Sequence, residues 1–301
     1  MITQKNYAAI DIGSNAVRLL VSTITEQKGR EDTDFRKTSL VRVPIRLGED
    51  VFEKSVISEK NIERMVDTMQ AFNLLMKTHG IVKYKACATS AMREAKNGAE
   101  VVEKIKAKTG VEIEIIDGNH EAAIIAATDL HELIKNDCNY LYVDVGGGST
   151  EYTLYSSGKT VASRSFKVGT VRLLNNLVDD GAWEEMEQWV RETTKPYKEI
   201  DLIGSGGNIN NIFKTSGKKE GKPLSLAYIK KYNDLLNSLS YEERVMELNL
   251  KSDRADVIIP ASKIYLNSMK WARADNIYVP KIGLADGIIK SLYHEDKKEL
   301  S

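Results

Sequence analysis

The stretches that decide the fold are YAAIDIGSNAVRLLV at residues 7–21 and YLYVDVGGGSTEYTL at residues 140–154. An offset of 133 residues places Asp11 over Asp144 and Gly13 over Gly146. Each stretch is an apolar strand that ends in Asp-x-Gly, followed by a turn of small residues and a second strand, the pattern of a β-hairpin. The repeat predicts two similar halves, each with an acidic residue at the mouth of its hairpin, and a cleft between them.

Around these hairpins the hydrophobic periodicity predicts alternating strands and helices. In the first half we expect strands at 7–11, 17–24, 40–47, 81–88 and 111–116, and helices at 58–80, 99–108 and 121–133. Ser58 is a suitable N-cap, and Gly80 a suitable left-handed end, for the first of these helices. In the second half we expect further strands at 159–168 and 201–203, and helices from 171 and 183, at 228–239 and at 257–271. This alternation predicts an α/β fold with mixed sheets flanked by helices.

Length and composition narrow the class of protein. A chain of 301 residues suggests two domains, and 43 basic residues balance 43 acidic ones. With no net charge, no global field attracts nucleic acid or an anionic membrane, so neither is expected as a partner. Because no long apolar run or signal peptide is apparent, we expect a cytoplasmic protein. Cys87, Cys138 and the four histidines lack the spacing of a disulfide framework or a zinc site.

Three glycine-rich turns are the main chemical signal: Asp11 to Asn15, Asp144 to Glu151, and Gly204 to Asn208. Without a Cβ the backbone can approach a phosphate closely and turn its N–H groups toward it. Any one of these turns alone is typical of an ordinary hairpin or helix entry, but the ordered set of three favours a phosphate-binding cleft. Neither a P-loop nor a dinucleotide fingerprint is present.

Acidic side chains flank the second turn. Asp144 and Glu151 lie on either side of three consecutive glycines, and Mg²⁺ is typically held by one or two protein carboxylates together with phosphate oxygens and water. The alternative for Asp144 is a turn-capping role. Asp11, at the repeat position, predicts an acidic residue opposite it across the cleft.

Charged residues elsewhere are less specific. We expect Arg93 in the first turn of a short helix capped by Thr89 or Ser90, where the helix dipole disfavours a cation by about 0.3–1 kcal/mol. An arginine there suggests a bound anion, with a surface salt bridge as the alternative. Glu121 at a helix start is by itself typical of an N-terminal acid. Residues 214–222 are expected to form a solvated basic loop, and residues 294–301 a charged, frayed tail.

In this order, the motifs resemble those of the exopolyphosphatase and guanosine pentaphosphate phosphohydrolase family. The similarity covers essentially the whole chain and is carried by Asp11-x-Gly-Ser-Asn, Ala88-Thr-Ser-Ala-x-Arg93, Gly118-Asn-x-Glu-Ala122, Asp144-x-Gly-Gly-Gly-Ser-Thr-Glu151, Val168-Gly-x-Val-Arg-Leu173, Gly204-x-Gly-Gly207 and Gly283-Leu-x-x-Gly287. The resemblance implies the actin-like ATPase superfamily, with two ribonuclease-H-like lobes and an interdomain cleft. The expected lobes are residues 1–124 and 125–286, with helix 287–301 packed back on the first.

The resemblance also implies an activity: Mg²⁺-dependent release of terminal phosphate from polyphosphate or from pppGpp. By position, Glu121 is similar to the family's catalytic base, Glu151 to its second essential carboxylate, and Asp144, with Glu151, to its metal ligands. Arg93 resembles the arginine that grips substrate phosphate. The implied backbone cradle consists of Gly13, Ser14, Asn15, Gly147, Gly148, Ser149, Gly206 and Gly207.

Some positions depart from the family pattern. His120 and Ala123 stand where members commonly carry a glutamate and an arginine, and Asn208 replaces a threonine. Long members also have a C-terminal helical region for which 301 residues leave no room, so short chains or nucleotides are expected to suit this form better than very long polyphosphate. The competing hypotheses are a sensor that binds polyphosphate or (p)ppGpp without turnover and, less favoured, an actin-like small-molecule kinase. A homodimer is possible on base rates.

Overall fold

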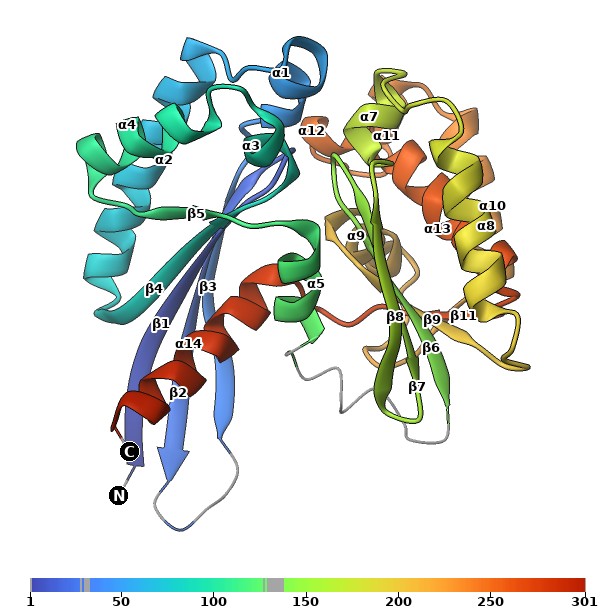
Figure 1. Ribbon diagram of the computed structural model, residues 1–301. Coiled ribbons are helices and arrows are strands. Elements are labelled where there is room, and N and C mark those ends of the chain that lie inside the picture. Colours follow the sequence, from blue (N-terminus) through green and yellow to red (C-terminus); the bar gives the residue numbers. More distant parts are fainter. Residues whose placement is uncertain (1, 28, 30–32, 127, 129–137, 301) are drawn as a thin grey trace. The chain divides into compact units, whose positions relative to one another are not determined.

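The computed structural model describes residues 2–27, 29, 33–126, 128 and 138–300. Contacts divide the chain into two compact units: unit 1 is residues 1–128 with 283–301, and unit 2 is residues 129–282. Each unit is a mixed sheet with helices packed on it (Figure 1). The predicted α/β fold with mixed sheets flanked by helices is therefore confirmed.

Unit 1 contains a sheet with the order β3-β2-β1-β4-β5. The first three strands are antiparallel neighbours, whereas β4 and β5 run parallel to β1. The strands are β1 (Ile2–Ile12), β2 (Val17–Gln27), β3 (Asp34–Val43), β4 (Ile81–Ala88) and β5 (Ile113–Ile115). The helices are α1 (Leu47–Lys54), α2 (Glu59–Thr78), α3 (Ser90–Glu94), α4 (Gly98–Thr109), α5 (Gly118–Ala126) and α14 (Leu284–Leu300).

Unit 2 contains a sheet with the order β10-β11-β9-β6-β7-β8. Its strands are β6 (Asn139–Val145), β7 (Thr150–Ser156), β8 (Lys159–Phe166), β9 (Asp201–Ser205), β10 (Leu224–Ser225) and β11 (Asn276–Tyr278). Its helices are α7 (Thr170–Leu174), α8 (Ala182–Thr194), α9 (Gly207–Thr215), α10 (Leu226–Ser238), α11 (Tyr241–Met246), α12 (Ser252–Ala255) and α13 (Ile258–Ala272).

The two sheets share one topology. Strands β6, β7 and β8 are antiparallel neighbours, and β9 and β11 run parallel to β6, which repeats the arrangement of β1 to β5. The sequence repeat at residues 7–21 and 140–154 is thus the start of two equivalent sheets. In both, the parallel strands end at the edge that carries the glycine turns, and ligands of open α/β sheets characteristically bind at this edge.

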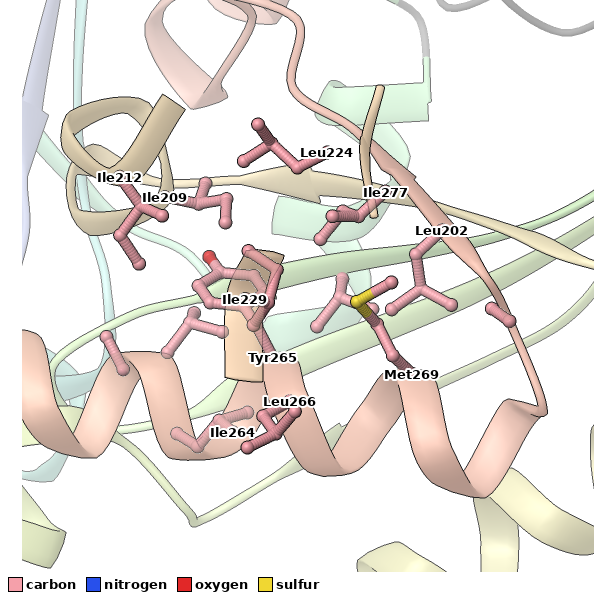
Figure 2. Packing of buried hydrophobic residues seen from close by; sticks show 14 of the residues in the cluster. Leu202, Ile209, Ile212, Leu224, Ile229, Ile264, Tyr265, Leu266, Met269 and Ile277 are labelled. Carbon is pink, nitrogen blue, oxygen red and sulfur yellow. The ribbon is translucent and has the colours of Figure 1, made fainter. Parts of the chain in front are cut away.

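The cores follow the predicted periodicity. Helix α2 begins after Ser58, whose side chain accepts a hydrogen bond from the Asn61 N–H, and its apolar stripe is buried in unit 1. Gly80 follows with φ of 61°, the predicted left-handed end. In unit 2, buried side chains of α13 gather with those of β9, β11 and α9 in one cluster (Figure 2). These cores make each sheet a rigid support for its edge.

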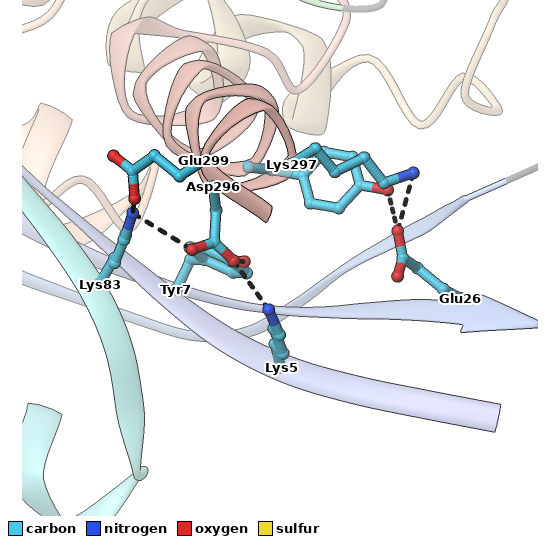
Figure 3. Close-up of polar contacts among 8 residues, drawn as sticks. Lys5, Tyr7, Glu26, Lys83, Asp296, Lys297 and Glu299 are labelled. Carbon is cyan, nitrogen blue, oxygen red and sulfur yellow. Dashed lines mark hydrogen bonds and ion pairs between the residues drawn. The ribbon is translucent and has the colours of Figure 1, made fainter. Parts of the chain in front are cut away.

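The expectation of a frayed C-terminal tail is wrong. Helix α14 continues to Leu300 and packs on β1, β2 and β4. Asp296 of this helix pairs with Lys5 at 2.8 Å and accepts a hydrogen bond from the Tyr7 hydroxyl at 2.7 Å (Figure 3). Lys83 bridges Asp296 at 3.1 Å, and these contacts hold the pKa of the Asp296 carboxyl below its usual value, chiefly through the Lys5 hydrogen bond. The charged residues of α14 thus hold the helix to the sheet of unit 1 and do not form a solvated tail.

Several expected boundaries were also wrong. The strand expected at 40–47 is β3, which begins at Asp34 and ends at Val43, because Pro44 lacks an N–H to continue the ladder. Leu47 instead opens α1, after Arg46 in a left-handed conformation. Helix α5 starts at Gly118 rather than Glu121, and the rest of the helix expected up to residue 133 falls largely outside the described residues.

No helix within the described ranges is both long and apolar enough to cross a membrane.

Gly287 fixes how closely α14 approaches α5, since a Cβ at this position would lie 2.2 Å from the Ile124 carbonyl oxygen. We expect Gly287→Ala to destabilise unit 1 by about 1–3 kcal/mol, the usual range for overpacking. Gly283→Ala is the matched control, because its Cβ would meet nothing within 4 Å. Thermal unfolding followed by circular dichroism should show a lower Tm for the first variant alone. An equal Tm for both would contradict the close packing described here.

Candidate functional site

Three candidate segments of unit 1 meet at one edge of its sheet. The register places Ile12 beside Ala88, and Ala88 beside Ile115, so β1, β4 and β5 end together. The Thr89 N–H donates to the Ile12 carbonyl at 3.1 Å, and the Ile116 N–H donates to the Ala88 carbonyl at 3.0 Å. The turn at residues 13–15, the start of α3 and the start of α5 therefore lie at the same edge.

The first glycine turn is held from one side. The Gly13 N–H donates to the Ala16 carbonyl at 3.1 Å, while the Ser14 carbonyl accepts from the Gly48 N–H at 2.7 Å. The Asn15 carbonyl likewise accepts from the Arg46 N–H at 3.0 Å. The segment that enters α1 thus fixes the carbonyls of this turn. Across the edge, the buried Ser14 hydroxyl lies 2.8 Å from the Ser90 hydroxyl of α3.

Helix α3 starts after Thr89, as the sequence predicted, and Arg93 is its fourth residue. Helix α3 has five residues, so Arg93 is in its last turn, where the helix dipole favours a cation. Its guanidinium donates to the Ile116 carbonyl at 2.6 Å. The next residue, Asp117, caps α5 by accepting from the His120 N–H at 2.7 Å. Arg93 is therefore tied to the segment that carries Glu121, which is half-buried in the first turn of α5.

The second glycine turn, in unit 2, shows the same construction more fully. The Gly146 N–H donates to the Ser149 carbonyl at 2.9 Å, the counterpart of the Gly13 contact. The carbonyls of Gly146 and Gly147 accept from the N–H groups of Thr170 and Val171 in α7, at 3.0 and 2.9 Å. The Gly148 carbonyl accepts from Arg172 Nε at 2.8 Å.

These contacts orient the opposite face of the turn. In a trans peptide the C=O and the following N–H point in opposite directions, and no cis peptide occurs in the described chain. Because α7 takes three successive carbonyls, the N–H groups of Gly147, Gly148 and Ser149 all point away from α7. Backbone N–H groups directed to one side are suited to contact an anion.

Gly169 and Gly206 are required by close approach. A Cβ on Gly169 would lie 2.4 Å from the Gly147 carbonyl oxygen, so only glycine lets α7 reach the turn. Gly206 precedes α9 with φ of 116° and sits next to the Val145 carbonyl and Asp144. At Gly207 a Cβ would lie 2.8 Å from the guanidinium of Arg254, which donates to the Gly207 carbonyl. A cation therefore stands at the third glycine turn.

A row of oxygen-bearing side chains crosses the unit 2 sheet beside these turns. Asp144 is directly opposite Glu151 on β7 and beside Ser205 on β9, and Glu151 is opposite Ser165 on β8. Ser205 Oγ lies 3.2 Å from Asp144 Oδ2, and Ser165 Oγ donates to Glu151 Oε1 at 2.9 Å. Glu151 is buried, with 4% of its surface exposed. Two carboxylates thus oppose each other where like charges are destabilising.

The repeat position in unit 1 carries the opposite charge. Arg18 stands 133 residues before Glu151, is the cross-strand partner of Asp11, and forms an ion pair with it at 2.7 Å. The buried Asp11 is therefore neutralised within its own hairpin. Of the two hairpins, only the second therefore sets two carboxylates side by side. The position of Asp11 opposite Asp144 across the expected cleft stays a prediction.

The residues of unit 2 fit a hard divalent cation. No group of three or more His, Cys, Asp or Glu side chains that could hold a metal occurs in the part of the chain described here. Mg²⁺ does not need such a group, because it commonly takes one or two carboxylates plus phosphate and water oxygens. Burial, and then the Asp144 carboxylate, raises the pKa of Tyr142 well above its usual value. Tyr142 stays protonated and donates to Asp144 at 3.4 Å.

The predicted residues thus fall into two groups. Gly13, Ser14, Asn15, Arg93 and Glu121 meet at the edge of unit 1, and the second set meets at the edge of unit 2: Asp144, Gly147, Gly148, Ser149, Glu151, Gly206 and Gly207. Their roles, and the cleft expected between the halves, stay predictions.

The sequence reading missed Arg18, Tyr142 and Arg254. The repeat offset contained a signal for Arg18, because it aligns with Glu151. Tyr142 lies two residues before Asp144, so both side chains are expected on the same face of the strand. An ordinary tyrosine of the core shows the same spacing. Arg254 reaches Gly207 from a helix 47 residues away, and no local pattern indicates that contact.

Comparison with known proteins finds one matching family and several relatives. The model of the Ppx/GppA phosphatase family matches residues 30–296. A bifunctional 3-dehydroquinate synthase/phosphatase of Fusobacterium nucleatum is 29% identical to this chain. The match covers 90% of this chain and 44% of that protein. A putative exopolyphosphatase of Haemophilus influenzae is 23% identical, with 96% of this chain and 91% of that protein covered.

A third relative is the guanosine-5'-triphosphate,3'-diphosphate pyrophosphatase of Aliivibrio fischeri, 25% identical over 96% of this chain and 60% of its own length. This chain therefore spans about half the length of several relatives it matches. Among solved structures, the Ppx/GppA family member of Aquifex aeolicus superposes with a TM-score of 0.76 at 25% identity, covering 98% of this chain and 99% of that one.

The charge difference between the hairpins predicts opposite effects at repeat positions 18 and 151. In metal-free buffer Glu151→Gln removes one of two opposed carboxylates, so we expect a gain of about 0.2–1 kcal/mol in stability. Arg18→Gln takes the ion pair from the buried Asp11 carboxylate, so we expect a loss of about 1–3 kcal/mol. Thermal unfolding in EDTA measures both. A loss of stability in Glu151→Gln would show that the two carboxylates do not repel each other.

Proposed function

The chain belongs to the Ppx/GppA phosphatase family, and from this we propose that it is a phosphohydrolase releasing terminal phosphate from a chain of phosphoanhydrides. Inorganic polyphosphate and pppGpp are the two substrates that the family resemblance implies. Water attacks the terminal phosphorus, and the bond between that phosphorus and the bridging oxygen breaks. The products are orthophosphate and a chain that is one phosphate shorter.

The single observation that carries the proposal is the second glycine turn. Helix α7 takes the carbonyls of Gly146, Gly147 and Gly148, so three successive N–H groups are directed to the other side. Such a fixed array suits the oxygens of a phosphoryl group, on which negative charge is spread in the transition state. Arg254 at Gly207 supplies a positive charge to the same edge.

We propose that Asp144 and Glu151 hold Mg²⁺. Their carboxylates oppose each other on β6 and β7, and the Ser205 hydroxyl lies beside Asp144. When bound, the cation neutralises phosphate oxygens and offsets the repulsion between the two acids. Tyr142 and Ser205 contact Asp144 Oδ2 and orient the carboxylate as positioning residues.

In this proposal, unit 1 supplies the base. Glu121, in the first turn of α5, takes a proton from the attacking water. Arg93, fixed by its hydrogen bond to the Ile116 carbonyl, retains guanidinium N–H donors for a phosphate oxygen. The Ser14 hydroxyl, next to Ser90, and the backbone of Gly13 and Asn15 form the matching cradle.

Release of phosphate from tripolyphosphate, long-chain polyphosphate, pppGpp and ATP tests the activity, with Mg²⁺ present. Glu121→Gln should lower kcat by about 10²–10⁴-fold with KM little changed, because a general base acts in the transition state. Glu112→Gln, an exposed glutamate of the same unit, is the control. Binding of these compounds without phosphate release by the wild type would identify a sensor instead.

The metal assignment has its own test. Mg²⁺ should raise the Tm of the wild type, since a ligand that binds only the folded state stabilises it. Asp144→Asn should abolish both this shift and the activity, whereas the exposed Asp180→Asn should retain both. An equal Mg²⁺-induced shift in wild type and Asp144→Asn would remove Asp144 from the metal site.

A further inference from the structure

A group of exposed lysines lies outside the residues assigned so far. The loop between α9 and β10 carries Lys218, Lys219 and Lys222, and Lys281 joins them from the segment after β11. These four residues are called the basic rim. Glu220 is the one acid among residues 214–223, and it pairs with Lys281 at 2.9 Å. The rim therefore keeps a net positive charge.

The rim stands at the same edge of the unit 2 sheet as the glycine turns. Strand β10 is antiparallel to β11, with Leu224 opposite Ile277, so the loop enters β10 where β11 and β9 end. The carbonyl of Ile282, next to Lys281, accepts from Ser205 Oγ at 3.1 Å. Ser205 in turn lies 3.2 Å from Asp144. The ion pair of Glu220 with Lys281 thus ties the loop to the edge that carries the proposed metal site.

Strand order sets the spacing along this edge. From β6 to β10 there are three intervals, β6-β9, β9-β11 and β11-β10. At about 4.8 Å each, β10, which the rim loop enters, is roughly 14 Å from β6, whose end carries the second glycine turn. That separation is too large for the phosphoryl group under attack. It suits the more distant part of a linear substrate whose end occupies the turn.

The chemistry of the rim favours phosphate over a nucleoside. Residues 214–223 read KTSGKKEGKP and contain no aromatic side chain, whereas proteins commonly stack bases on aromatic rings. Lys218 Nζ donates to the Pro223 carbonyl at 2.7 Å, which holds one ammonium group in place on the loop. Lysine is a compact point charge that attracts an extended polyanion without reading its shape.

We propose that the basic rim is an outer subsite for linear polyphosphate, so that long-chain polyphosphate, rather than a guanosine nucleotide, is the preferred substrate. This proposal replaces the expectation from the sequence that short chains or nucleotides suit this form better. This inference rests on the proposed function, since it extends the same site. A long chain reaches both the glycine turn and the rim, whereas tripolyphosphate reaches only the turn. The rim therefore contributes to the affinity for long substrates alone.

The test compares two triple variants with the same change of charge. K218Q/K219Q/K222Q neutralises the rim. K159Q/K195Q/K198Q is the control, because these exposed lysines lie near the first residues of β6 and β9, at the opposite edge of the sheet. The rim variant should raise KM for long-chain polyphosphate about tenfold, from the loss of three exposed ion pairs. Its kcat, and its KM for tripolyphosphate, should match those of the wild type, and added salt should narrow the difference.

Binding of fluorescently labelled long-chain polyphosphate in EDTA gives a second readout that requires no turnover. We expect Kd to rise about tenfold in the rim variant and to stay unchanged in the control. Equal long-chain KM and Kd in the rim variant and the wild type would overturn the outer subsite, even if the enzyme is active. If the wild type hydrolyses neither substrate, the proposed function fails, and the Kd comparison alone decides the rim.

Discussion

The opposition of Asp144 and Glu151 is the constraint on which the edge of the unit 2 sheet that carries the glycine turns depends. A sheet places the Cβ atoms of directly paired residues within a few ångströms on one face, so the register of β6 and β7 brings Asp144 and Glu151 side by side. A fold tolerates such a pair when hydroxyl groups and a cation compensate for it. The surrounding hydroxyls of Ser205, Ser165 and Tyr142 provide part of that compensation.

The comparison between the two hairpins shows how one duplicated element carries two different arrangements of charge. Both turns are closed by the same backbone hydrogen bond and have their carbonyls taken by the segment that follows the third strand. The shared construction orients amide groups, whereas the residue at the cross-strand position sets the charge. Arg18 neutralises the Asp11 carboxylate of the first hairpin, whereas Glu151 places a second carboxylate beside Asp144 in the second hairpin.

Local patterns predicted a large part of this architecture, and long-range contacts account for most of what they missed. The two Asp-x-Gly hairpins, the apolar stripe of α2 and the gathering of glycine turns at strand ends all have short-range signals. Helix α1 starts after a left-handed arginine without a side-chain cap, so nothing in the sequence marks its beginning. Helix α3 has only five residues, so Arg93 lies in its last turn, and no signal near Arg93 indicated so short a helix. The approach of Arg254 to Gly207 comes from tertiary packing alone.

The contribution of α14 to unit 1 has a consequence for the order in which the protein assembles on the ribosome. Residues 129–282 form unit 2 and are synthesised before residues 283–301, which complete unit 1. Unit 1, which begins first in the sequence, is therefore completed after unit 2. Until α14 emerges, the faces of β1, β2 and β4 that it covers stay open to solvent, and the nascent chain carries that apolar surface through the synthesis of more than a hundred residues.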